Sequence, residues 1–279
     1  MALLNFILNL AGLLLWVNWR AMGFKEQVPY RSTLVHTLRS AAPRRPGRWR
    51  YFVGLVLLLL IRGWLYREIG SGLNWVPQLD LHVITLPFRS DLPWRMTLFS
   101  FLSFFLALAV FHLWLLLLSV ANRSEPDSQP VQRLVRLNLG LFERLPSVLT
   151  VLLVPVAGAA IWLILHPLLV NLRMLPVGES VRLIAEQGAV FGLVGLLTWK
   201  FLVIGLLLFH LLNSYVYLGR SPLWDFASLT ARNLLKPLIW FPLQVGKMDF
   251  APTLGILLVW VIGEFGGRGL IELFRCLPL

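Results

Sequence analysis

Six long apolar segments set the strictest limit on how this chain can fold. Because a helix rises about 1.5 Å per residue, about 20 residues cross the ~30 Å hydrocarbon core of a bilayer. Composition agrees with spans of this kind, since 58% of the residues are hydrophobic and only 14% are charged. The apolar runs are continuous rather than alternating, which favours helices over a barrel. The sequence therefore predicts an all-α integral membrane protein with about six transmembrane helices, at residues 2–19, 51–66, 97–120, 147–170, 188–217 and 250–274.

Three basic loops, each containing two well-separated prolines, divide these segments into pairs. The proline pairs are Pro29 and Pro43, Pro130 and Pro146, and Pro222 and Pro237. Each loop has an apolar segment on either side, and a unit repeated at this length indicates a duplicated supersecondary structure. We expect three units of helix, interfacial helix and helix: a degenerate one with an external loop over 1–96, a second degenerate one over 97–187, and a third over 188–279.

A short amphipathic segment lies within each proline loop, at about residues 31–38, 131–141 and 226–234. Pro130 and Pro222 stand where a proline can open a helix, and Pro146 and Pro237 where one can end it. We therefore predict three short helices in the membrane interface, with their apolar faces toward lipid.

Basic residues are concentrated in the proline loops, and eight of them fall between Arg20 and Arg50. The net charge is +12, but basic residues beside apolar helices set topology and attract anionic lipid headgroups rather than indicating nucleic-acid binding. The positive-inside rule predicts a multi-pass protein of the cell inner (plasma) membrane, with the proline loops cytoplasmic and both termini outside.

Three ionisable side chains, those of His112, Lys200 and His210, lie inside the predicted spans, where a charge is costly and a function is the default hypothesis. His112 and His210 occupy equivalent repeat positions, and Asn9 stands at the matching place in the first unit. The two histidines are candidates for inter-helix hydrogen bonds or, if they face each other, for binding haem iron. Lys200 is expected to pair with Glu264 or Glu186 or to extend toward the interface. Arg62 is expected to extend toward the interface in the same way.

Catalytic and metal-binding motifs are absent from the sequence. There is no Gly-x-Ser-x-Gly, no His-Glu-x-x-His and no phosphate-binding Gly-x-x-x-x-Gly-Lys, and the single cysteine, Cys276, has no partner for a metal site. We therefore predict that the protein is not an enzyme and has no catalytic residue, no metal and no resident cofactor, with haem as the alternative.

The last unit contains a motif that resembles the YggT family of bacterial and chloroplast integral membrane proteins. Residues 200–262 carry the best match, and the motif positions are Pro222, Thr230, Pro237, Gly246, Asp249 and Pro252. From the residues themselves, we expect Asp249 to cap the final helix and Gly246 to occupy a turn. The resemblance implies a small helical membrane protein without known enzymatic activity.

Two functions are consistent with these features. The first is a membrane scaffold or accessory subunit that organises, assembles or stabilises a larger membrane complex, with the lipid bilayer and other membrane subunits as partners. The alternative is a haem-handling or ion-transporting protein that uses His112, His210 and Lys200 within the membrane.

Overall fold

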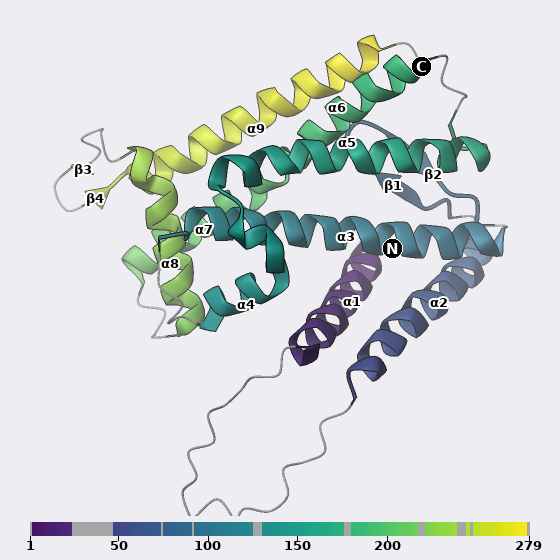
Figure 1. Ribbon diagram of the computed structural model, residues 1–279, viewed down its shortest axis with the longest axis horizontal. Helices are drawn as coiled ribbons and strands as arrows, with labels where there is room; N and C mark the ends of the chain where they lie inside the picture. Colours follow the sequence, from purple (N-terminus) through teal and green to yellow (C-terminus); the bar gives the residue numbers. More distant parts are fainter. Residues whose placement is uncertain are drawn as a thin grey trace, which may run out of the picture. The chain divides into compact units, whose positions relative to one another are not determined.

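The chain forms long helices, and the computed structural model in Figure 1 describes most of it. The described residues are 2–23, 47–73, 75–90, 92–124, 130–175, 180–216, 221–238, 244–245 and 248–277. The first proline loop, with the helix expected at 31–38, lies outside this part of the chain. So do Gly246 and the side chain of Asp249.

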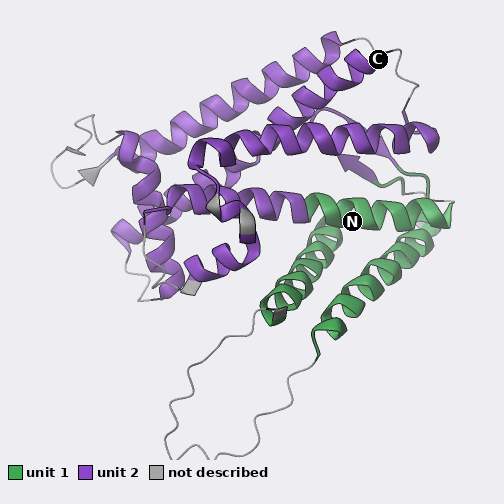
Figure 2. Ribbon diagram, in the orientation of Figure 1, with its two compact units in different colours: residues 1–77, 88–107 green, residues 78–87, 108–279 purple. Residues whose placement is uncertain are grey.

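Two compact units are present (Figure 2). The first comprises Met1–Pro77 and Phe88–Ala107, and the second comprises Gln78–Pro87 and Leu108–Leu279. The three repeated units expected from the sequence are a different division of the chain, and that division stays a prediction.

The first unit contains α1 (Ala2–Gly23), α2 (Arg48–Leu73) and the first half of α3 (Pro93–Ala121). α1 packs against α2. A Cβ added at Gly12 would lie 2.7 Å from Cε2 of Phe104, so the absence of a side chain lets α1 approach α3 closely. The core also contains a cluster of aromatic rings, which are Tyr66, Trp75, Phe88 and Phe99.

The second unit contains the remaining elements. These are the hairpin β1 (Gln78–Asp80) and β2 (Thr85–Pro87), the end of α3, α4 (Pro130–Leu139), a 3-10 helix at Gly140–Arg144, α5 (Ser147–Asn171), α6 (Val181–Leu197), α7 (Trp199–Tyr215), α8 (Pro222–Leu235), a 3-10 turn at Lys236–Leu238, the hairpin β3 (Gln244–Val245) and β4 (Met248–Asp249), and α9 (Ala251–Cys276). Both hairpins are antiparallel.

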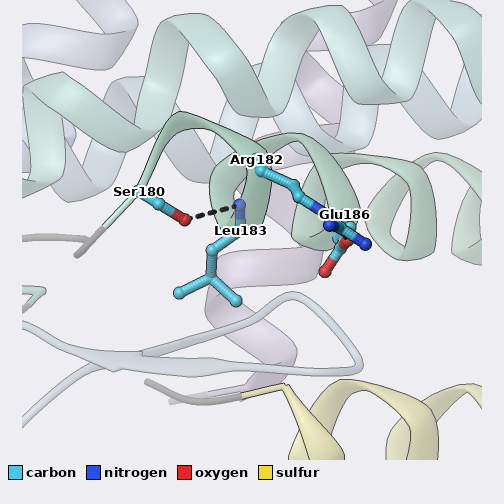
Figure 3. A network of polar contacts seen from close by, with 4 residues as sticks. All are labelled: Ser180, Arg182, Leu183 and Glu186. Carbon is cyan, nitrogen blue, oxygen red and sulfur yellow. Dashed lines mark hydrogen bonds and ion pairs between the residues drawn. The ribbon is translucent and has the colours of Figure 1, made fainter.

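α5 and α6 form the most closely packed pair of helices. A Cβ added at Gly158 would lie 2.6 Å from the Cα of Gly192, and one at Gly192 would collide with the carbonyl oxygen of Pro155. Small residues at such crossings let helix backbones meet in lipid, where van der Waals packing drives association. At the start of α6, Ser180 Oγ accepts a hydrogen bond of 3.2 Å from the backbone N–H of Leu183 (Figure 3).

α4 and α8 confirm the second and third short helices expected in the proline loops, and they are in contact with each other. α4 begins at Pro130 and α8 at Pro222, as the proline positions predicted. Each helix buries one face. The buried residues are Gln132, Val135, Asn138 and Leu139 in α4, and Phe226, Thr230, Ala231 and Leu235 in α8.

One expectation about the long helices needs correction. The fifth segment begins earlier than expected, at Val181, and is divided at Thr198 into α6 and α7. Within the described residues, five helical stretches are long and apolar enough to cross a membrane, so the count of six spans stays a prediction: Ala2–Met22, Pro93–Ala121, Ser147–Asn171, Val181–Tyr215 and Ala251–Cys276. The remaining segment does form a helix, α2, but this helix carries several arginines among its apolar residues.

Candidate functional site

The most unusual polar group of the first unit is Arg62, a buried arginine in the middle of α2. Its side chain is only 1% exposed. Nη1 donates to Asn9 Oδ1 at 2.6 Å, and Nη2 donates to Asn5 Oδ1 and, at 2.9 Å, to Ser103 Oγ. Nε donates to the hydroxyl of Tyr66 at 3.1 Å. The cluster therefore joins α1, α2 and α3 through one guanidinium, and we call it the Arg62 cluster.

This arrangement overturns the expectation that Arg62 reaches toward the membrane interface. Among the residues that the structure describes, the groups bound to the guanidinium are neutral amides and hydroxyls, and none is a carboxylate. A buried charge is tolerated only where its donors are satisfied. Three helices supply those acceptors here, which makes the position of α1 and α3 a condition for burying the charge.

A second cluster joins two elements of the second unit, α8 and the end of α3, around Asn122. Asn122 Nδ2 donates to Thr230 Oγ1 at 2.7 Å, and Asn122 Oδ1 accepts from Asn233 Nδ2 at 2.9 Å. Thr230 Oγ1 also donates to the carbonyl of Phe226 at 2.8 Å within α8. Thr230 and Asn122 are both fully buried. The motif threonine thus fixes α8 to the end of α3.

A third cluster contains Lys200, at the start of α7. Its Nζ lies 3.6 Å from Oε2 of Glu264 in α9, so the pairing expected with Glu264 is confirmed and the alternative with Glu186 is not what forms. Glu186 instead pairs with Arg182 in its own helix (Figure 3). Glu264 also pairs with Arg268 at 3.0 Å. A Cβ at Gly263 would collide with the lysine side chain, so that glycine leaves room for it.

The break at Thr198, next to Lys200, is held by two tryptophans. Trp114 Nε1 donates to the carbonyl of Thr198 at 3.1 Å, and Trp199 Nε1 donates to the carbonyl of Leu113 at 2.8 Å. These two hydrogen bonds run in opposite directions between α3 and the junction of α6 with α7. The sequence showed no proline or glycine pair at Thr198, and the break was missed for that reason.

The histidines that were candidates for haem binding take part in other contacts. His112 Nδ1 lies 2.8 Å from the carbonyl of Leu108, one turn earlier in α3, and its ring meets Phe111 edge-on. His210 lies in α7. His166 lies in α5, is only 6% exposed, and has its ring 5.8 Å from that of Trp162. The described residues contain no group of three histidine, cysteine or acidic side chains able to hold a metal ion.

The remaining motif positions mark the ends of helices. Ser221 caps α8 just before Pro222, and Pro237 lies in the 3-10 turn that follows the helix. α9 begins at Ala251 with Pro252 in its first turn, and its N-cap residue is Phe250. The capping role of Asp249 stays a prediction, because its side chain lies outside the described residues.

The three clusters share a common chemistry. Each consists of polar side chains from different helices that bond to one another; Arg62 and Asn122 are buried, whereas Glu264 of the Lys200 cluster is partly exposed. Comparisons of the chain with models of known protein families, with curated proteins and with solved structures gave no match. What the protein does must therefore be inferred from the chemistry of its own residues.

Proposed function

We propose that this protein is a multi-pass membrane scaffold or accessory subunit that organises, assembles or stabilises a larger membrane complex. The observation that carries the proposal is the use made of polar groups inside the apolar helices. In the Arg62 and Asn122 clusters these groups hold helices to one another, which is the work of a framework. A transport path would need polar groups lining a route through the membrane.

The apolar surface supports the same function. In α1, only 6% of the most apolar window is buried inside the protein, and in α5 only 17%. Leu3, Phe6 and Ile7 of α1 are among the exposed large side chains. Such surfaces are covered by lipid or by other membrane subunits.

The proposed topology has six spans in the cell inner membrane. α2 is the sixth, crossing with Arg62 turned into the unit rather than toward lipid. The proline loops are cytoplasmic and both termini lie outside, as the basic loops indicate. We also propose a distant relationship to the YggT family, on the motif around α8 and the start of α9.

Purification from native membranes in a mild detergent tests this function. We expect the intact chain to co-purify with one or more other membrane proteins in a fixed ratio. The variant Asn122→Leu breaks the second cluster while keeping the apolar exterior. This variant should lower the yield of the complex. A wild-type chain that runs as a monomer, with no companion at stoichiometric amount, contradicts the proposal.

A second candidate function, ion or proton movement, is favoured by the Lys200 cluster. Lys200 Nζ and Glu264 Oε2 lie 3.6 Å apart. Lys200 stands two residues after the helix break at Thr198, which lies inside the candidate span Val181–Tyr215. Broken helices with ionisable groups are common where membrane proteins bind ions.

Flux assays in proteoliposomes separate the two functions. Transport predicts that Lys200→Met and Glu264→Gln each abolish ion or proton flux, while Arg182→Gln, in an exposed pair of α6, leaves it unchanged. The scaffold function predicts no flux above empty liposomes for the wild-type chain. Flux that depends on Lys200 replaces the first proposal with the second.

A further inference from the structure

A polar cavity lies where α3 ends and α5 begins, and no function considered so far uses it. Its volume is about 200 Å³. Several water molecules fit into such a space, at roughly 30 Å³ each. Its lining includes Ser119, Arg123, Gln132, Arg136, Glu143 and Thr150. All belong to the second unit.

The charge of the lining favours an anion. Among the described residues, two arginines and one glutamate line the cavity, which leaves one excess positive charge. Arg136 Nε lies 2.9 Å from Glu143 Oε1, so this arginine is held in place. Arg123 Nη1 donates to the carbonyl of Leu145 at 2.9 Å and to Ser147 Oγ at 3.2 Å. A guanidinium has five N–H donors, so a guanidinium anchored through Nη1 still presents others to a phosphate.

A buried polar atom without a hydrogen-bond partner gives an independent indication of a ligand. Gln132 is only 2% exposed, and its Nε2 donates to the backbone carbonyl of Asn122 at 3.3 Å. That bond fixes the orientation of the amide and leaves Oε1 as the second polar atom. Among the described residues, this buried oxygen has no hydrogen-bond donor. Buried acceptors are rarely left unpaired, and one that lines a cavity calls for a donor on the occupant.

We propose that the cavity binds the phosphodiester headgroup of an anionic phospholipid with a hydroxyl group, of the phosphatidylglycerol type. The phosphate meets Arg123 and Arg136, and a headgroup hydroxyl donates to Gln132 Oε1. Depth supports a lipid source, because Ser119 and Thr150 stand within one turn of the ends of the candidate spans Pro93–Ala121 and Ser147–Asn171. The site relies on the membrane setting proposed above, but not on any partner subunit.

Lipid retention in nanodiscs tests the site. The full chain is reconstituted in phosphatidylcholine with a minor share of phosphatidylglycerol, and retained lipid is measured by native mass spectrometry. We expect Arg123→Gln to lower phosphatidylglycerol retention by about tenfold or more, as loss of a hydrogen bond to a charged group does. Arg182→Gln, which removes the same charge in α6, should leave retention unchanged. Equal retention in these two variants overturns the proposal.

A second variant keeps the charges and tests the hydroxyl. Gln132→Met should remove the preference for phosphatidylglycerol over phosphatidic acid, which lacks the glycerol headgroup. An unchanged preference overturns that contact. Soluble glycerol 3-phosphate offers the same phosphate and hydroxyl groups without acyl chains, and its binding is measured beside that of phosphatidylglycerol. If it binds as tightly as the lipid, the assignment of a lipid to the cavity is overturned. Co-purifying subunits are measured on the same variants, so loss of lipid is distinguished from failure of the scaffold function.

Discussion

The Arg62 cluster predicts an unusual pattern of stability across a set of variants. Replacing both Asn5 and Asn9 by leucine removes two acceptors from the guanidinium and leaves it with Tyr66 and Ser103. A hydrogen bond to a charged group contributes about 1.5–3 kcal/mol, so the double variant should lose roughly 3–5 kcal/mol, as expected for a buried charge deprived of its partners. Adding Arg62→Met removes the charge itself and should restore about 2 kcal/mol or more, because an apolar replacement of a buried charge is often neutral.

Unfolding in mixed micelles, followed by tryptophan fluorescence, measures these free energies. The control is Asn18→Leu in the same helix. Among the described residues, the Asn18 amide donates to the carbonyl of Leu14 at 2.9 Å within α1, so this variant should change stability by less than about 0.5 kcal/mol. The reasoning fails if the Asn5 and Asn9 double variant costs no more than this control. It also fails if the triple variant with Arg62→Met is less stable than the double variant.

Three further variants test other contacts of the fold by the same unfolding assay. Gly192→Ala should lower the free energy of unfolding by about 1–3 kcal/mol, because the new methyl group collides with α5. Its control, Gly205→Ala, has open space around it and should raise the free energy of unfolding by up to about 1 kcal/mol. Equal effects of the two variants would refute the close approach of α6 to α5. Thr230→Val should cost about 1–3 kcal/mol, because it leaves the buried amide of Asn122 without an acceptor. Ser180→Ala should cost about 1 kcal/mol through loss of the α6 cap, and no change would remove that role.

Local signals were sufficient to predict most of the helices. Continuous apolar runs gave the long helices, and Pro130 and Pro222 marked the starts of two short ones, because proline fits the first turn of a helix and not its interior. These features depend on residues close together in the sequence, which is why the sequence alone was enough.

The Arg62 cluster was missed because its parts are far apart in the sequence. Asn5 and Asn9 are four residues apart in α1, and so are Arg62 and Tyr66 in α2, so each pair lies on one helix face. Those spacings were a signal that each helix has a polar face. Nothing in the sequence states that the two faces meet. A single arginine in an apolar segment has the same local pattern whether it is buried or reaches to the membrane interface.

The polar clusters explain how apolar helices acquire a unique arrangement. In lipid, one apolar face packs about as well as another, so apolar contact alone specifies rotation poorly. Each residue turns a helix by about 100°, and a slip of one residue in α1 would carry Asn5 and Asn9 away from Arg62. The guanidinium would then be buried without its acceptors, at a cost larger than most packing differences. A single arginine with neutral partners therefore selects one register for three helices, and this role fits the scaffold function that we propose.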